Sequence, residues 1–225
     1  MQEFPGVLAE ARLWQIVLLS LEVSLAAVGL ATLAGLPLGA AIAVGRFPGR
    51  KSLIVLLNAL MGLPPVVVGL AVYLLLSRAG PLGSLGLLFT PGAMVVAQTI
   101  LILPIVAALA RQAIEDAWRE YEEQLRSLGA SDVSAALTLL WDIRFSLLTA
   151  VLAGLGRACA EVGAVIIVGG NIDGVTRVMT TTIALETSKG DLPLALGLGV
   201  VLIAIVLALN AAAFLVKEAA QRRYG

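Results

Sequence analysis

Long apolar runs alternate with shorter polar segments along this chain of 225 residues. A helix needs about 20 apolar residues to cross the hydrocarbon core of a bilayer. The pattern predicts five transmembrane helices, at residues 13–44, 53–77, 92–110, 145–168 and 192–216. The first run is longer than one crossing needs, so we expect its helix to be tilted, or bent near Pro37.

The composition strengthens this interpretation. Hydrophobic residues make up 60% of the chain and charged residues 13%, whereas soluble domains are about half apolar and a quarter charged. We therefore expect an all-α, polytopic membrane protein in which residues 1–225 form a single transmembrane domain. No basic stretch precedes the first run, and the run is too long for a signal-peptide core, so we interpret it as a retained helix.

Basic residues predict the orientation, because loops rich in Lys and Arg stay in the cytoplasm. An odd number of crossings puts the termini on opposite sides. With the N-terminus outside, ten basic residues lie on the cytoplasmic side: Arg46, Arg50, Lys51, Arg111, Arg119, Arg126, Arg144, Lys217, Arg222 and Arg223. Four lie outside: Arg12, Arg78, Arg177 and Lys189. The excess predicts an external N-terminus, a cytoplasmic C-terminus, a cytoplasmic loop at residues 111–144 and an external loop at residues 169–191.

Missing residue types exclude several functions. The chain has no histidine, which excludes imidazole-based catalysis and His-ligated metal sites. Its only cysteine, Cys159, lies in an apolar run, so an intrachain disulfide and a thiolate metal cluster are both impossible. The formal net charge of zero argues against a nucleic-acid partner. We expect no metal, no cofactor and no catalytic residue.

The loop at 111–144 carries eleven charges but also has a helical pattern. Helix-forming residues continue to Leu128, Gly129 interrupts them, and a second helix is predicted to start after Ser131 or Asp132, both good N-caps. Gly129 is expected to have a positive φ. This pattern fits a charged connector at the membrane surface. It also fits a docking site for a soluble partner, using the apolar residues Leu125, Leu128, Leu137, Leu140 and Trp141.

Three charged residues lie within the predicted spans: Glu22, Arg157 and Glu161. A charge at the bilayer centre costs about 2.5–3.5 kcal/mol or more, so such groups normally face the bundle interior and pair. Arg157 and Glu161 are four apart, hence on one helix face, and Glu22 lies at a similar depth to Glu161. We predict a structural clasp between the first and fourth helices. Small residues are expected at helix contacts: Gly35 with Gly39, and Gly197 with Gly199.

The segment "EQLRSLGAS" resembles the EAA loop of membrane subunits of binding-protein-dependent ABC importers. In that loop an acid precedes a glycine by six positions, as Glu123 precedes Gly129 here, and an alanine follows, as Ala130 does. Leu139 stands where the family has an aliphatic residue ten positions after the glycine. The chain departs from the loop at two alanine positions and at a later Leu-Pro pair, which are here Gln124, Leu125 and Trp141-Asp142.

Other segments extend the resemblance over residues 13–218. "LMGLPPVVVGL" is similar to the Pro-Pro helix of molybdate, tungstate and sulfate permeases. "RACAEVGAVIIVGGNIDGVT" resembles that group's run of Glu, Gly-Ala, then Gly-Asn-Ile-x-Gly-x-Thr. "GPLGSLGLLFTPGAMVVAQ" and "TRVMTTTIALETSKGD" are more similar to the tungstate branch than to the molybdate branch.

The resemblance implies a permease of type I ABC importer architecture in a bacterial or archaeal cell (inner) membrane, surrounded by membrane lipid. It implies import of an oxyanion, tungstate in the first place, with molybdate or sulfate as alternatives. The expected partners are a second copy of the chain, cytoplasmic ABC ATPase subunits and an external solute-binding protein. The chain itself is expected to be no enzyme, and it contains no Gly-x-x-x-x-Gly-Lys-[Ser/Thr] phosphate loop.

The resemblance also assigns site residues. Coupling to the ATPase falls on Glu123, Leu125, Leu128, Gly129, Ala130 and Leu139. The substrate pathway or gate falls on Asn171, Thr176, Arg177, Thr180 and Thr181. Hydroxyl groups and the backbone at Gly169-Gly170 offer weak neutral donors to a tetrahedral dianion, which suits a pathway that must release it. Arg177 either attracts the anion or pairs with Asp173 or Glu186.

Three alternatives stay open. The polar residues at 169–191 could form an ordinary solvated loop that only covers the helix ends. The chain could be a stand-alone secondary transporter, which the intramembrane charges favour, although five helices with no visible repeat count against it. An intramembrane enzyme has little support, because no paired-acid or HExxH signature is present.

Overall fold

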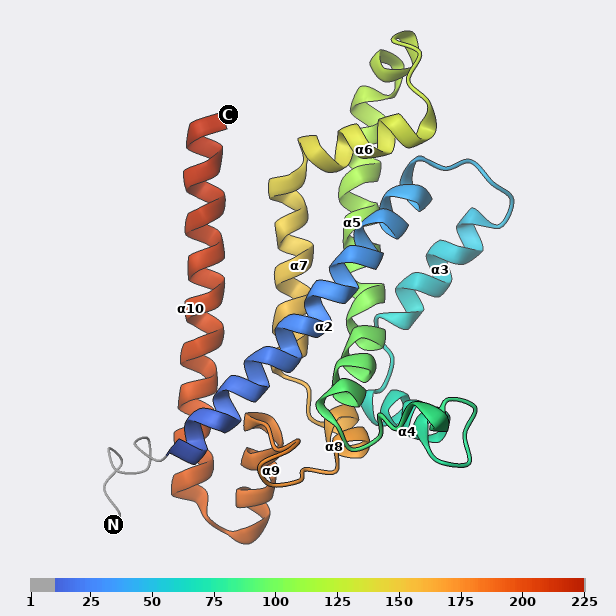
Figure 1. Ribbon diagram of the computed structural model, residues 1–225. Coiled ribbons are helices and arrows are strands. Elements are labelled where there is room, and N and C mark those ends of the chain that lie inside the picture. Colours follow the sequence, from blue (N-terminus) through green and yellow to red (C-terminus); the bar gives the residue numbers. More distant parts are fainter. Residues whose placement is uncertain (1–10, 225) are drawn as a thin grey trace. The chain divides into compact units, whose positions relative to one another are not determined.

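The computed structural model describes residues 11–224, and every regular element in that range is helical (Figure 1). The elements in chain order are α2 (Ala11–Val44), α3 (Arg50–Leu60), α4 (Pro65–Leu76), the 3₁₀ helix η1 (Gly83–Leu85), α5 (Pro91–Ser127), α6 (Asp132–Asp142), α7 (Arg144–Cys159), α8 (Gly163–Gly169), α9 (Met179–Lys189) and α10 (Leu192–Tyr224). The all-α prediction is confirmed for this range. The side of the membrane predicted for the N-terminus involves residues 1–10, which lie outside the described residues.

Three of the described helices are long and apolar enough to cross a membrane by themselves: Leu13–Val44, Pro91–Ser127 and Leu192–Leu215. Two bent pairs, α3 with α4 and α6 with α7, raise the number to five if each pair is one span. The five-span topology and the orientation of the termini therefore stay predictions. Neither Pro37 in α2 nor Pro104 in α5 ends its helix.

The predicted span at 53–77 is not one helix, because two consecutive prolines interrupt it. Neither Pro64 nor Pro65 has a backbone N–H to continue the hydrogen bonds of α3. Pro64 adopts extended angles, with φ −65° and ψ 122°, and Pro65 begins α4 at the position where a missing N–H costs nothing. The Pro-Pro pair is thus a helix boundary.

The predicted span at 145–168 is also interrupted. The helix α7 ends at Cys159, Val162 has the non-helical angles φ −120° and ψ −52°, and the seven-residue α8 begins at Gly163. The segment 169–191 differs from a simple loop, since residues Met179–Lys189 within it form α9. Between α7 and α10 the chain therefore forms two short helices, α8 and α9.

The chain forms two compact units, each assembled from three segments. The first unit contains residues 11–27, 64–99 and 156–211 of the described range, and the second contains residues 28–63, 100–155 and 212–224. The helices α2, α5, α7 and α10 each supply residues to both units. The single transmembrane domain expected from the sequence stays a prediction.

In the second unit, α2, α5, α6 and α7 pack through small side chains. Their shared core consists of Ala40, Ala43, Val44, Ala110, Ile114, Ala117, Trp118, Ala135, Leu139 and Leu147. A Cβ atom on Gly39 would lie 2.6 Å from the Ala107 carbonyl oxygen, so glycine is needed for α2 to approach α5 this closely. Gly35 meets Val106 and Ala107 in the same way, which confirms the first predicted glycine contact. Gly199, by contrast, has open space around it.

In the first unit, two contacts fix the short helices. Gly69 lets α4 pack directly on α8, because a Cβ there would lie 2.8 Å from the Cα of Ala164. Met179 at the start of α9 is buried between Ile16 and Val17 of α2, with α10 side chains around it. The Met179 N–H also donates to Ser20 Oγ at 2.7 Å. These contacts place the N-terminus of α9 on α2.

The close approach of α2 to α5 predicts the effect of adding one methyl group. Gly39→Ala should lower the free energy of unfolding of the detergent-solubilised protein by about 1–3 kcal/mol, and with it the unfolding temperature. The reason is that the new Cβ overlaps backbone atoms, which cannot rotate away. Gly29→Ala is the matched control in the same helix, since Gly29 has nothing within 4 Å. That variant should be neutral or up to about 1 kcal/mol more stable. Equal unfolding temperatures for both variants would contradict the packing described here.

Candidate functional site

A buried carboxylate, Glu161, lies at the break between α7 and α8. Its side chain is 2% exposed, and three groups bind it from three directions. Oε1 accepts the Ala164 N–H at 2.9 Å and so caps the N-terminus of α8. Oε2 lies 3.1 Å from Arg157 Nη2 and forms an ion pair without hydrogen-bond geometry. The backbone oxygen accepts the Thr180 hydroxyl at 2.8 Å, which ties the break to α9. We call this cluster the Glu161 node.

The predicted clasp between the first and fourth helices is corrected in one respect. Arg157 and Glu161 pair as expected, one helical turn apart. Glu22 is exposed, on the same face of α2 as Leu25 and Ala26, and within the described residues it forms no ion pair. The position of Glu22 along α2 predicts its depth, but its position around the helix axis points its side chain away from Glu161. The node is joined to α9 through Thr180 instead.

A small polar cavity of about 20 Å³ adjoins the node, with Ser20, Ser24, Gln98, Cys159, Glu161 and Thr180 among its lining residues. Gln98 is 4% exposed, and its Nε2 donates to the Ala158 carbonyl at 3.2 Å. Its Oε1 has no hydrogen-bond partner among the described residues. This volume suits one water molecule, which needs about 10–15 Å³. A four-oxygen anion is several times larger, and the carboxylate would repel it, so the node is a positioning cluster and not an anion site.

The threonine hydroxyls of segment 169–191 are mostly used inside the fold. Thr176 is 1% exposed, donates to the Gly169 carbonyl at 2.6 Å and accepts the Ile172 N–H at 2.9 Å. Thr181 is fully buried and exchanges hydrogen bonds with the backbone of Val178 at the start of α9. In this conformation neither hydroxyl is a free donor for a substrate. The expectation that both face a pathway is corrected accordingly.

The other residues predicted for the gate lie nearer the surface. Arg177 pairs with Asp173 at 3.1 Å, one of the two acids proposed for it, while Glu186 pairs with Lys189. The second guanidinium nitrogen of Arg177 also reaches the carbonyl of Asn171. A cation that is already neutralised attracts an anion only weakly, so Arg177 must exchange partners before it can contact one.

Strained backbone marks a residue that sequence reasoning missed. Gly170 and Asn171 have φ of 71° and 50°, and Phe89 has φ of 63°, a conformation that costs about 1–3 kcal/mol for residues other than glycine. The Phe89 N–H donates to the Val168 carbonyl at 2.9 Å. Its ring lies against Gly170 and edge-on to Tyr73. The loop before α5 is therefore fastened to the C-terminal end of α8.

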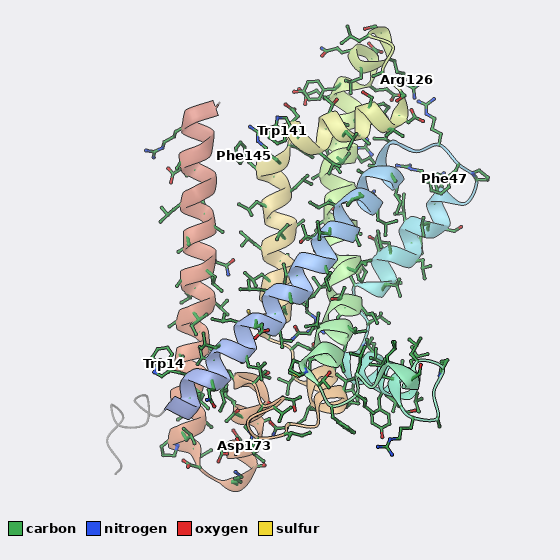
Figure 2. All side chains as sticks on the ribbon, in the orientation of Figure 1. Trp14, Phe47, Arg126, Trp141, Phe145 and Asp173 are labelled. Atoms are coloured by element: carbon green, nitrogen blue, oxygen red, sulfur yellow. The ribbon has the colours of Figure 1, made fainter. Side chains whose placement is uncertain are left out.

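The segment after α5 agrees with its predicted helix–glycine–helix pattern. Gly129 has φ of 74°, and Ser131 caps α6 by accepting the Ser134 N–H at 3.2 Å. Four large apolar side chains project from this segment: Leu128, Val133, Leu137 and Trp141, which are 82%, 71%, 63% and 72% exposed. We call them the docking patch. Figure 2 shows Trp141 at the end of α6 and Arg126 near the end of α5.

The other residues assigned to coupling have different environments. Glu123 is exposed, Ala130 is half-buried, and Leu125 is partly buried against the second-unit core. Leu139 is 1% exposed and belongs to that core, so it anchors α6 and makes no external contact in this conformation. Val133 was not among the predicted coupling residues, but its side chain is exposed on the surface where that of Leu139 is buried. Its signal was the amphipathic periodicity of α6.

An ion-pair network stiffens the polar part of α5. Glu115 contacts Arg111 within α5 and lies 3.6 Å from Arg50 at the start of α3. Arg50 Nε also donates to the Ile42 carbonyl at 2.7 Å, near the end of α2. Two turns beyond, Glu122 pairs with Arg46 and with Arg126. The polar end of α5 is thus connected to the turn between α2 and α3.

Apolar spans, a helix–glycine–helix segment with an apolar patch and a capped helix break together define a membrane-embedded transport subunit. Residues 35–225 match the family of binding-protein-dependent transport system inner membrane components, and the chain belongs to this family. It is a permease subunit of the ABC importer class and an inner membrane protein.

Three relatives indicate the range of the family around this chain. A Haloferax volcanii protein named "Probable anion ABC transporter permease protein" is 42% identical over 197 residues, covering 85% of each chain. The tungstate uptake system permease protein of Peptoclostridium acidaminophilum is 38% identical, covering 93% of this chain and 92% of the relative. A sulfate transport system permease protein of Synechocystis is 34% identical, covering 92% and 76%.

The Glu161 node predicts different outcomes for two acids at similar depth. Glu161→Gln should lower the yield and thermal stability of folded membrane protein, by roughly 1–3 kcal/mol, because Arg157 loses its counter-charge while still partly buried. Glu22→Gln should leave both unchanged, since Glu22 is exposed. Fluorescence-detected size exclusion and thermal unfolding measure both quantities. An equal loss of yield and stability in the two variants would show that Glu22 also belongs to the charge cluster. Normal accumulation of Glu161→Gln with loss of transport would show that the node has a role in transport.

Proposed function

We propose that this protein forms the translocation pathway of an ATP-driven importer of a tetrahedral oxyanion, and that the anion is tungstate. The observation that carries the substrate is the 38% identity with a tungstate permease over nearly the full length of both chains. The segments 80–98 and 176–191, which resemble the tungstate branch, support it. Molybdate and sulfate are the alternatives, and the sulfate permease at 34% identity keeps the second of them open.

The proposed complex contains two copies of this chain, two cytoplasmic ABC ATPase subunits and an external solute-binding protein. The family description itself names a binding-protein-dependent system. The chain contains no phosphate loop of its own, so the proposal assigns ATP hydrolysis to the partner subunits. The two copies meet through apolar helix faces that are exposed in a single chain, such as the face of α10 that carries Leu196, Val200 and Ile203.

The docking patch is the proposed contact for the ATPase. Exposed Leu and Trp side chains around a short surface helix fit a hydrophobic groove on a soluble partner. Leu139 fixes α6 to the second-unit core, so a push on α6 is delivered to α5 and α7 rather than absorbed by a loose loop. The helix α5 has 37 residues and is about 55 Å long. Near the start of the same helix, Gln98 contacts the end of α7 next to the Glu161 node.

The proposed route for the anion uses the surface residues of the external segment. Asn171, Arg177 and Thr180 are the partly exposed members of the predicted gate set. The Arg177–Asp173 pair supplies a mechanism, since an arriving dianion competes with one carboxylate for the guanidinium and is released when the pair reforms. Weak, exchangeable contacts suit conduction better than a tight site.

Gly129 gives a direct test of the coupling segment. Gly129→Asp should leave the helices inserted but abolish ATPase association or uncouple hydrolysis from uptake, because it adds a charge and a strained β-carbon within the docking patch. Gly49→Asp is the matched control, since Gly49 also has a positive φ, of 85°, with open space around it. Glu123→Ala should have a milder effect, of about 1 kcal/mol or less in association. Uptake and ATPase copurification at parental levels in Gly129→Asp would remove the coupling role.

The substrate is tested with the cognate external binding protein and the assembled importer. Calorimetry with tungstate, molybdate and sulfate should show tightest binding for tungstate, and the loaded binding protein should stimulate ATP hydrolysis by the reconstituted complex. Tightest binding of sulfate or molybdate would replace the substrate while keeping the importer. Uptake by the purified subunit alone, driven by a proton gradient, would instead identify a secondary transporter.

A further inference from the structure

An apolar groove of about 380 Å³ lies on the second unit between α2 and α7. Its walls are formed mainly by Leu33 and Leu36 of α2 and by Leu147, Leu148 and Val151 of α7. The volume is far more than the roughly 30 Å³ that one water occupies, and the walls offer little for water to bind. The ligand that fills this groove must therefore be mostly hydrocarbon.

One end of the groove is charged. Arg144 lines it at the first residue of α7, where the chain turns by 78° between α6 and α7. Its guanidinium lies 4.8 Å from the ring centre of Trp141 and 4.5 Å from that of Phe145, so two aromatic rings hold it in place. Figure 2 labels Trp141 and Phe145. Nη1 donates to the Trp141 carbonyl at 2.7 Å. Arg144 has no ion pair within the described residues, so most of its five N–H donors remain available.

The surroundings indicate where this end lies. A tryptophan beside an arginine, at the junction of an apolar helix with a polar segment, is typical of the boundary between hydrocarbon and headgroups. The chain is an inner membrane protein and the groove walls belong to apolar helices, so lipid acyl chains are available to fill the groove. A soluble anion would leave the hydrocarbon walls unfilled, and a purely apolar helix would leave the Arg144 charge without a counter-ion.

We propose that this groove binds an anionic phospholipid, with one acyl chain along α2 and α7 and the headgroup phosphate on Arg144. The planar guanidinium can donate two parallel hydrogen bonds to phosphate oxygens. A basic pocket between helices at the membrane boundary is a recurrent form of lipid recognition. Because Leu140 of α6 also lines the groove, the bound lipid contacts the same helix that carries the docking patch.

The experiment measures lipid binding to the purified protein in detergent by native mass spectrometry, titrated with phosphatidylglycerol or phosphatidylcholine of identical acyl chains. The unmodified protein should bind phosphatidylglycerol at least tenfold more tightly. Arg144→Gln should bind the two lipids equally, because it removes the charge and keeps the walls. Lys51→Gln is the charge-matched control in the same unit, since Lys51 is exposed and does not line the groove. It should retain the preference.

A second variant tests the hydrocarbon part. Leu33 is 76% exposed and lines the groove, so Leu33→Trp should fold normally and obstruct it, lowering the affinity for both lipids at least fivefold. Equal affinities of the unmodified protein for the two lipids would overturn the proposal, as would an unchanged preference in Arg144→Gln. Displacement of the phosphatidylglycerol by millimolar inorganic phosphate would reduce the site to a simple anion contact. Loss of the dimer in Leu33→Trp without loss of lipid would identify a second copy of this chain as the occupant.

Discussion

Ending a helix inside hydrocarbon leaves backbone N–H and C=O groups that no solvent can reach, and each must find a partner within the protein. The helix α8 has only seven residues, and burial of Ala164 and Gly169 near its two ends imposes the same constraint there. At its N-terminus Glu161 accepts the Ala164 N–H, and at its C-terminus the Gly169 and Val168 carbonyls accept from Thr176 and Phe89. A helix this short is not stable alone. Its existence depends on Glu161 in the segment before it, on Thr176 in the segment after it, and on the Phe89 backbone in the loop before α5.

The same constraint explains the charge pair. A carboxylate is a strong acceptor for a helix N-terminus, but it introduces a buried negative charge that must be balanced. Arg157, one turn earlier in α7, supplies the opposite charge. The Ala158 carbonyl near the end of α7 accepts both the Glu161 N–H and the Gln98 side chain. Neutral threonine hydroxyls serve the neighbouring breaks, where no charge is required. Polar residues in this part of the chain first complete the fold, and only the partly exposed ones are available for substrate.

Sequence reasoning succeeded where the signal is local. The apolar runs, the helix–glycine–helix pattern with its Ser131 cap, and the Arg157–Glu161 pair all depend on residues within a few positions of each other. It failed where the cause lies far along the chain. The Gln98 side chain, sixty positions earlier, donates a hydrogen bond to the Ala158 carbonyl, and nothing in the sequence near Ala158 indicates this. Averaged hydropathy therefore predicted an unbroken span. The family resemblance assigned Leu139 to coupling, and the sequence near it does not show that residues of α2 and α5 bury its side chain.

The length of α5 has a consequence for how this protein can change over time. Glu115 contacts Arg50 at the start of α3, and Glu122 contacts Arg46 seven positions later in α5. Each residue of a helix adds a rotation of about 100° and a rise of about 1.5 Å. One inserted or deleted residue between these two positions would turn one contact away from its partner while leaving the other intact. Substitutions in this stretch are constrained only by packing, whereas its number of residues is fixed by two distant contacts that must share a single helical register.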